Sequence, residues 1–321
     1  MKKIYTCLAF YFLCVSVDGL EQKFQVKSVI LEDLKANVLV LPNSEKGVRL
    51  DISNQPDDVK VYSTEAVLRI EQAGTLWEKT SGFFSSNKNG SSSEKVLEGT
   101  KIILYVSKNI PVRISVKGSS KVFYKAVNSP LVLKLFENTE GTVSAVKKME
   151  LLAAGNSMAK IEKIVGLANF HGKDDAKIHV KSGTLQTFAY KAENNASLKV
   201  DADIVQAFII GGGKTTIDLK SVSSVLKAEG IGTNAINVQS VNGYVKLVGR
   251  FNSKFSVMKG VIDKLEASAA SSSAITVDAV VQNARLDATG SGKIYIKKLR
   301  GVILDEVIKS NGKIVVEHES N

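Results

Sequence analysis

The sequence predicts an all-β protein that folds as a single-stranded right-handed parallel β-helix, or β-solenoid, with about ten coils, each of roughly 17–20 residues. The first observation is a pair of apolar residues that recurs every 19 or 20 residues in the C-terminal half. The pairs are Ile178/Val180, Leu198/Val200, Ile217/Leu219, Ile236/Val238, Phe255/Val257, Ile275/Val277, Ile294/Ile296 and Ile314/Val316. A fixed period of this length indicates one short structural unit that is repeated and stacked.

Two further observations favour strands over helices. A helical repeat needs roughly 33 residues or more, whereas these units are shorter and rich in Thr, Ser, Val and Gly,. Many units also hold a second apolar pair, such as Leu226/Ala228 and Leu286/Ala288, with Leu304 at the matching place in the last unit. We therefore expect two or three short strands per unit, bent at corners of Gly, Ser or Asn. Right-handed winding is expected for parallel crossovers, although short-coil solenoids of the opposite hand exist.

Residues 1–19 are expected to form a secretory signal peptide. Two lysines precede an apolar run over residues 4–17, and Gly19 supplies a small residue for cleavage,. The run is shorter than the roughly 20 apolar residues that span a bilayer. We therefore expect the chain to meet a membrane only through this signal.

Cysteine and charge limit the class of protein. Both cysteines, Cys7 and Cys14, lie within the expected signal, so the rest of the chain has no disulfide and no cysteine-based metal site,. Loss of Lys2, Lys3 and Asp18 with the signal changes the formal net charge from +11 to +10. A basic, exported chain is expected to meet anionic polymers, glycans or lipid surfaces, but no nucleic acid, because no basic block is paired with aromatic residues.

The N-terminal part, residues 20–100, is expected to be rich in β-strands. Short alternating segments at residues 24–26, 38–40, 48–52, 59–61 and 68–70 are separated by turn-forming residues,. A long Ser/Gly-rich loop is expected over about 74–99, with three aromatic residues, Trp77, Phe83 and Phe84,. These aromatics either form a binding tip or fold back onto the sheet, and the second arrangement is favoured because a lone Trp is usually buried in part.

The regular pattern begins at Lys101 and continues to the last residue, so we expect the β-solenoid domain to span residues 101–321. Within it, Ile236 should point inward and Asn237 outward. We therefore expect Ile236→Asp to cost several kcal/mol and Asn237→Asp to be nearly silent.

The segment from Lys101 to Gly301 resembles the head GIN domain family of proposed autotransporter adhesins, which are exported bacterial proteins. The resemblance is carried by KIILYVSKNIPVRISVKGSSKV from Lys101 and by LDATGSGKIYIKKLRG, which ends at Gly301. The Gly-Ser-Gly corner that is typical of this family occurs unaltered only at residues 290–292 of this chain. The resemblance implies a right-handed β-helix at the cell envelope with an adhesive role, and it carries over no catalytic residues.

No catalytic, cofactor or metal site is predicted. The three histidines, His171, His179 and His318, lack the spacing that places two ligands on one face, and His179 is expected to be a solvated surface residue,. The segment 211–215 reads GGGKT but lacks the upstream glycine of a phosphate-binding loop, since position 208 is Phe,. Glycoside hydrolysis needs two carboxylates on one face, which here means carboxylates on neighbouring coils. The outward positions between the apolar pairs do not place carboxylates in this way.

The candidate binding surface consists of outward side chains on the coils together with the loop aromatics. One outward column contains Lys199 and Tyr295, and the next contains Lys181, Lys220 and Lys297. These lysines either contact an anionic ligand or serve solubility and discourage edge pairing. The full set of candidates is Trp77, Phe83, Phe84, Lys181, Lys199, Lys220, Tyr295 and Lys297.

The function that the sequence favours is a non-catalytic, exported binding or adhesion module that presents its sheet faces to a glycan or another anionic envelope polymer. We expect it in the periplasm, in the outer membrane or at the cell surface. The alternatives are a self-associating structural scaffold and, less favoured, a carbohydrate-active β-helix enzyme. The charged residues that follow the last strand favour a monomer, because they protect its edge from pairing,.

Overall fold

The computed structural model describes residues 22–53, 59–72, 100–125 and 129–318. Every regular element within these ranges is a β-strand, as predicted. The part of the chain that the structure describes contains no helix long and apolar enough to cross a membrane. The expected signal peptide and the expected loop aromatics Trp77, Phe83 and Phe84 lie outside the described ranges.

The protein is a rod of stacked parallel turns, with about 11 turns in the solenoid. The predicted β-solenoid is therefore confirmed. The N-terminal strands are β1 (Gln22–Phe24), β2 (Ser28–Leu34), β3 (Asn37–Asn43), β4 (Val48–Ser53), β5 (Val59–Ser63), β6 (Val67–Gln72) and β7 (Lys101–Ser107). The solenoid strands are β8 (Val112–Val116), β9 (Lys121–Tyr124), β10 (Leu131–Leu135), β11 (Glu140–Val143), β12 (Val146–Ala153), β13 (Met158–Ile161), β14 (Ile164–Gly172), β15 (Lys177–Val180), β16 (Gly183–Ala192), β17 (Ser197–Gly212), β18 (Thr216–Ile231), β19 (Ala235–Arg250), β20 (Lys254–Ala269), β21 (Ala274–Ala288), β22 (Lys293–Ile308) and β23 (Lys313–His318).

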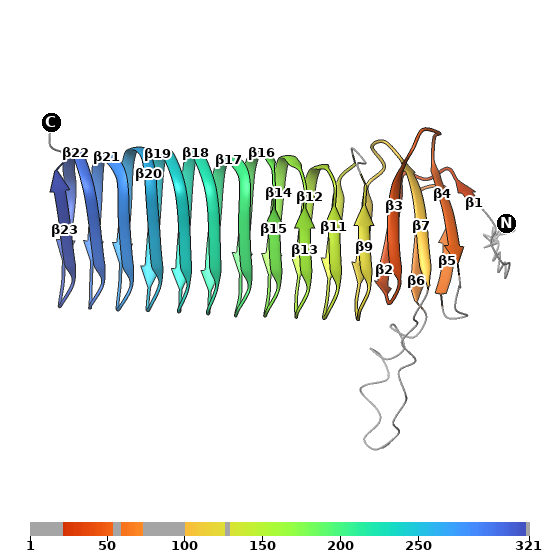
Figure 1. The fold of residues 1–321 in the computed structure, drawn as a ribbon, viewed down its shortest axis with the longest axis horizontal. Helices are drawn as coiled ribbons and strands as arrows, with labels where there is room; N and C mark the ends of the chain where they lie inside the picture. Colours follow the sequence, from red (N-terminus) through yellow and green to blue (C-terminus); the bar gives the residue numbers. More distant parts are fainter. Residues whose placement is uncertain (1–21, 54–58, 73–99, 126–128, 319–321) are drawn as a thin grey trace, which may run out of the picture.

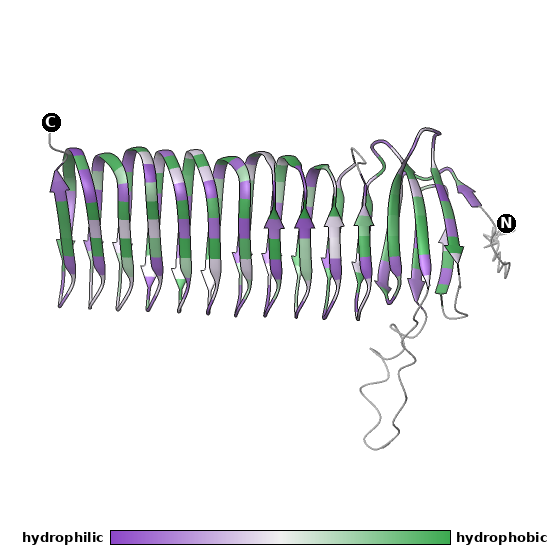
Figure 2. Cartoon of the chain, viewed as in Figure 1, coloured by the Kyte–Doolittle hydropathy of each residue, from purple (hydrophilic) through white to green (hydrophobic). Residues whose placement is uncertain are grey.

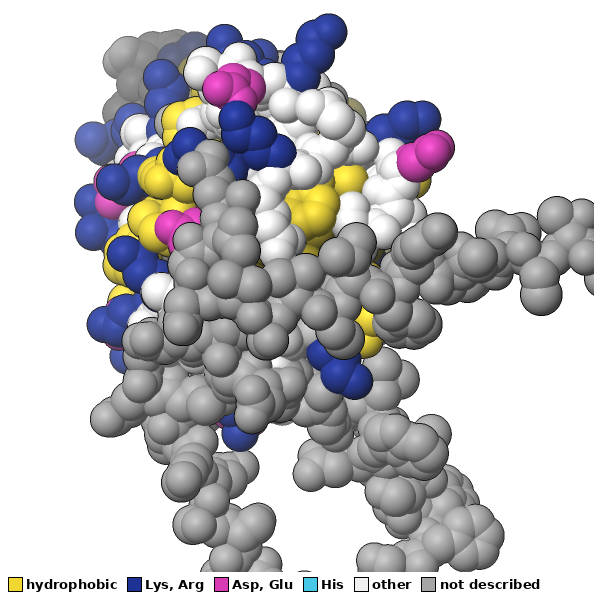
Figure 3. Space-filling view, turned by 90° about the vertical axis from the view of Figure 1, so that its right-hand side faces the viewer, with side chains coloured by type: hydrophobic (Ala, Val, Ile, Leu, Met, Phe, Trp, Pro, Cys, Tyr) yellow, Lys and Arg dark blue, Asp and Glu magenta, His cyan; other side chains and the backbone are white. Residues whose placement is uncertain are grey.

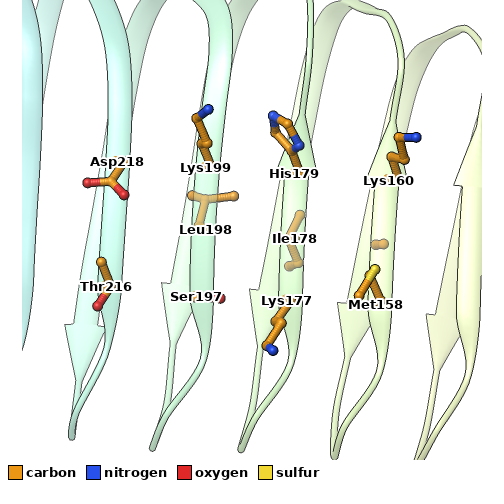
Figure 4. A pocket seen from close by; sticks show the side chains of 11 residues that line it. Met158, Lys160, Lys177, Ile178, His179, Ser197, Leu198, Lys199, Thr216 and Asp218 are labelled. Atoms are coloured by element: carbon orange, nitrogen blue, oxygen red, sulfur yellow. The ribbon is translucent and has the colours of Figure 1, made fainter.

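Each solenoid turn contributes to two sheets. The front sheet in Figure 1 contains β9, β11, β13, β15, the first halves of β17 to β22, and β23, whereas the back sheet contains β8, β10, β12, β14, β16 and the second halves. The front strands run upward while successive turns advance from right to left (Figures 1 and 4). This combination makes the winding right-handed, as parallel crossovers favour.

The apolar pairs seen in the sequence form continuous interior columns. Ile217, Ile236 and Phe255 are consecutive partners in register, and each is buried. Figure 2 shows the resulting alternation of hydrophobic and hydrophilic residues along the strands. Stacking buries side chains that a single turn could not cover, which explains why the pattern must repeat.

An aromatic segment lies inside the rod at β14 and β16. The rings of Phe170 and Phe188 meet edge to face at 5.5 Å between centroids, and Phe188 stacks on Tyr190 at 6.4 Å. The Tyr190 hydroxyl is buried and has no hydrogen-bond partner among the described residues. Burial raises the pKa of this phenol well above its usual range,.

The corners where the back sheet returns to the front sheet hold small polar residues. Ser253 Oγ donates a hydrogen bond to the Arg250 carbonyl at 2.6 Å, and Ser273 Oγ donates to the Ala270 carbonyl at 2.9 Å. Each hydroxyl adds a second hydrogen bond to a carbonyl that also accepts a backbone N–H, from Gly232 at 3.4 Å and from Ser273 at 3.3 Å respectively,. The buried polar residues of this column are Ser120, Thr139, Ser157, Thr215, Asn234, Ser253 and Ser273.

The N-terminal strands do not stack in sequence order. Strand β2 lies between β6 and β8, and β3 lies between β7 and β9, all in parallel. The outer side of this end is formed by antiparallel pairs, β1 with β4, β4 with β7, and β5 with β6. Seen from this end, Lys and Arg side chains gather along the left side of Figure 3, which is the front sheet of Figure 1.

The last turn departs from the interior pattern. A register shift after Ala284 pairs Leu286 with Glu306, so a carboxylate replaces the aliphatic residue of that column. Leu304, which was expected to point inward, is instead 51% exposed. Terminal repeats of solenoids commonly carry such polar substitutions because no further turn covers them.

Candidate functional site

The predicted surface residues that the structure describes all lie on the front sheet. Lys199 and Tyr295 occupy the outward column that passes through His179 and Asp218. The other three lysines each come directly after the second apolar residue of a front-strand pair. They are Lys181 after Val180, Lys220 after Leu219 and Lys297 after Ile296. The structure therefore brings five of the predicted residues to one sheet, spread over several turns.

These cations are paired with carboxylates, a pairing that was not expected from the sequence. Their distances are 2.9 Å for Lys181 to Glu162, 3.3 Å for Lys199 to Asp201, 3.5 Å for Lys220 to Asp203 and 2.8 Å for Lys297 to Asp278. Tyr295 likewise donates a hydrogen bond to Glu317. The lysines predicted to contact an anion are thus already balanced by neighbouring negative charge.

A shallow depression in the front sheet lies between β13 and β18. Its lining includes Met158, Lys177 and His179, and Figure 4 shows their side chains on neighbouring turns. His179 is paired rather than freely solvated, because its Nε2 lies 2.8 Å from an Asp201 oxygen. The hydrogen bond from His179 and the nearby Lys199 lower the pKa of the Asp201 carboxyl,.

Four carboxyl groups at the front sheet and its edges, those of Glu162, Glu193, Asp201 and Asp203, have a lowered pKa. Hydrogen bonds from Lys191 and Lys173 lower the pKa of Glu193 to about 2. The pKa of Glu162 falls because of Lys181, and that of Asp203 because of Ser221. A glycosidase needs one carboxyl with a raised pKa as its general acid, and these groups are shifted in the opposite direction. Among the described residues no group of three or more His, Cys, Asp or Glu is placed to hold a metal ion.

The back sheet carries a second cluster, which we call the face patch: Phe208, Lys227, Tyr244 and Lys264. The Lys227 Nζ lies 5.8 Å from the ring centre of Phe208 and 6.0 Å from that of Tyr244. Lys264 Nζ lies 5.6 Å from the same Tyr244 ring. Cations over aromatic faces are attracted by the ring quadrupole, so the four side chains form one connected surface.

Tyr244 is the centre of the face patch. Its hydroxyl donates a hydrogen bond to Glu266 at 3.0 Å, and Lys264 pairs with the same carboxylate at 2.7 Å. Partial desolvation and Glu266 together raise the pKa of the Tyr244 phenol. The hydrogen bond to Glu266 and the lysines of the preceding and following turns therefore hold the ring in place.

The sequence contained a weak signal for the face patch. Phe208 and Tyr244 lie in different columns, since Phe208 aligns with Lys227 and Tyr244 aligns with Lys264. A search along single columns therefore finds only one aromatic in each. The relation becomes visible when columns that are two residues apart are compared across three turns.

Comparisons with known proteins give the following. No family model matches the chain. No curated protein matches it. One solved structure, titled "putative lipid binding protein" from Parabacteroides distasonis, has a TM-score of 0.24 and 13% identity, with 92% of this chain and 96% of that chain covered. Another, titled "putative cell adhesion protein" from Clostridium sporogenes, has a TM-score of 0.20 and 13% identity, with 69% and 99% covered.

Proposed function

We propose that the protein is a non-catalytic adhesion module of the cell envelope that binds a glycan or another surface polymer along the back sheet of its solenoid. The observation that carries this proposal is the face patch, in which two aromatic rings and two lysines are connected across successive turns. Aromatic faces pack against the apolar faces of sugar rings, and lysines donate hydrogen bonds to hydroxyl and acidic groups.

The shape of the surface favours an extended ligand. Adjacent turns are about 4.8 Å apart, so the residues of the face patch span a length that a chain of sugars can follow. Small ligands prefer concave pockets that bury most of their surface. A flat sheet with side chains at regular intervals instead suits a polymer that makes several weak contacts at once.

The proposed non-catalytic role is supported by four carboxyl groups, each of which has a lowered pKa. The carboxylates of Glu162, Glu193, Asp201 and Asp203 each accept a hydrogen bond or an ion pair that favours the charged form. An expected signal peptide over residues 1–19 supports export to the periplasm, outer membrane or cell surface. No cofactor is needed for the proposed role.

The experiment is a binding screen of the purified protein on acidic and neutral envelope glycans, followed by titration calorimetry on any glycan that binds. Tyr244→Ala is expected to weaken binding at least tenfold, because it removes the central ring and its two cation contacts. Tyr295→Ala is the matched control, since Tyr295 has a similar contact with Lys297 at 6.0 Å on the opposite sheet. Loss of binding with Tyr295→Ala but not with Tyr244→Ala would place the site on the front sheet instead.

A further inference from the structure

A second exposed apolar surface lies at the edge of the rod, next to but separate from the face patch. We call it the corner patch and define it as Ile210, Ile231, Phe251, Lys214 and Arg250. Ile210 is 46% exposed, Ile231 37% and Phe251 57%. These residues come from three consecutive turns, since Ile231 is opposite Gly212 of β17 on one side and Arg250 of β19 on the other.

Phe251 occupies a backbone position that does not suit a large side chain. Its φ is +63°, in the left-handed region that bulky residues rarely adopt,. The corresponding corner positions of the other turns carry Gly, Asn, Asp, Ser or Glu, at Glu137, Gly155, Asp174, Asn194, Gly213, Gly232, Ser271, Gly290 and Ser310. A strained and exposed aromatic residue at one corner indicates a role for that side chain outside the fold itself.

The shape of this site restricts the kind of partner. The corners lie along the lower edge of the rod in Figure 1, where the back sheet turns into the front sheet. On this convex edge Phe251 and Ile231 project outward beside the bare backbone of Gly213 and Gly232. A convex edge cannot enclose a small molecule, and a strip of three side chains is too small for a stable protein interface, which buries about 800 Å² per partner.

The positive charges of the corner patch indicate an anionic partner surface. Lys214 is exposed and makes no ion pair with a described residue, and Arg250 is 56% exposed. Arg250 pairs with the carboxylate of Glu229 at 3.5 Å. Exposed ion pairs of this kind contribute little to the free energy of folding. Exposed apolar side chains flanked by Lys and Arg are the arrangement with which proteins enter the interface of an anionic membrane.

We propose that the corner patch inserts Phe251 and Ile231 into the surface of an anionic lipid bilayer, with Lys214 and Arg250 at the level of the headgroups. This contact is additional to the signal peptide, through which alone the sequence led us to expect membrane contact. The corner patch lies at the rod edge and the face patch on the back sheet, so one rod could lie on a bilayer by its edge while a polymer follows its sheet. The proposal does not depend on the glycan being found.

The test is co-sedimentation of the protein with phosphatidylcholine vesicles that contain or lack phosphatidylglycerol. Wild type is expected to bind the anionic vesicles more tightly, and Phe251→Ser to bind them at least about tenfold more weakly, because burial of a Phe side chain is worth that factor or more. Serine occupies this corner position at Ser271 and Ser310, so the variant should fold and melt no lower than wild type. Lys214→Glu should weaken binding only to the anionic vesicles and only at low salt.

The matched control is Phe123→Ser, which removes a 44% exposed phenylalanine from the front sheet. It should leave vesicle binding unchanged, and any contribution from the apolar run at residues 4–17 is common to all variants. Equal binding by Phe251→Ser and wild type, or no binding by wild type, would overturn the proposal. So would Phe251-dependent capture of a purified envelope protein without vesicle binding. Tyr244→Ala should lose glycan and keep vesicle binding, which separates this proposal from the adhesive function.

Discussion

Substitution of two adjacent residues, Ile236 and Asn237, by aspartate tests the division of the strand into an inward and an outward face. Ile236 is 1% exposed and lies between Ile217 and Phe255 in its interior column. Ile236→Asp loses about 2 kcal/mol of apolar burial. Keeping the new carboxyl protonated at pH 7 against its ordinary pKa costs about 4 kcal/mol more, which gives a total of about 6 kcal/mol.

Asn237→Asp is now expected to cost about 2 kcal/mol at pH 7, whereas the sequence led us to expect almost no effect. Asn237 Nδ2 donates a hydrogen bond of 2.8 Å to Asp218 on the preceding turn. The substitution removes that donor, worth about 1 kcal/mol, and places two partly exposed carboxylates side by side, which adds about 1 kcal/mol of repulsion.

Urea unfolding followed by circular dichroism at pH 7 and pH 4 measures both costs. In Ile236→Asp the new buried carboxyl has a raised pKa in the folded state, and in Asn237→Asp one carboxyl of the adjacent pair does. The loss of stability caused by the charge is therefore full at pH values above the folded-state pKa. It declines as the pH falls from that pKa toward the pKa of the unfolded chain. Asn237→Ser is the control, because Ser256 occupies the same column on the next turn. Equal destabilisation by Ile236→Asp and Asn237→Asp at pH 7 would refute the assignment of faces.

Three other substitutions test separate features of the rod. Tyr190→Phe should raise the unfolding free energy by about 1 kcal/mol, because it removes a buried hydroxyl without a partner,; a loss of stability would reveal a hidden partner. Gly260→Ala should destabilise by more than 1 kcal/mol, since φ is +116° and an added Cβ would lie 1.7 Å from the Val241 carbonyl oxygen,; a melting temperature equal to wild type would contradict this geometry. Glu306→Leu should promote end-to-end association in sedimentation velocity, because it removes a charge from the uncovered last turn at a position in register with the buried Leu286,. A variant that stays at the wild-type size at all concentrations would show that this charge is not what limits association.

The interior of the rod was predictable because it depends on one rule, the alternation of apolar residues at a fixed period. Ile236 and its column partners obey that rule on every regular turn. The structure has about 11 turns, in agreement with the prediction of about ten, and the turn made by β8 and β9 already belongs to the stack. Leu304 broke the rule because a register shift in the last turn is not visible in the spacing of apolar residues.

The surface was predictable only in part. The alternation of Glu162, Lys181, Asp201 and Lys220 on successive turns contains the signal for ion pairs along the front sheet, since like positions stack. The corner patch could not be found in this way, because the significance of Phe251 depends on a backbone torsion angle and on its exposure. The sandwiched position of β2 was equally hidden, because a strand has the same alternation whichever neighbours it acquires.

That sandwiched position determines where folding can start. One edge of the turn made by β2 and β3 pairs with β6 and β7, and the other edge pairs with β8 and β9, so the turn has both neighbours only when the chain is complete to Tyr124. Closing these distant contacts carries the main entropic cost, whereas each later turn adds about 20 residues onto a ready edge. The rod should therefore have a slow, cooperative seed at its N-terminal end and a fast, stepwise extension toward β23. A chain that emerges on the far side of a membrane with its N-terminus first would thus stay unstructured until residue 124 has crossed, and then fold as it arrives.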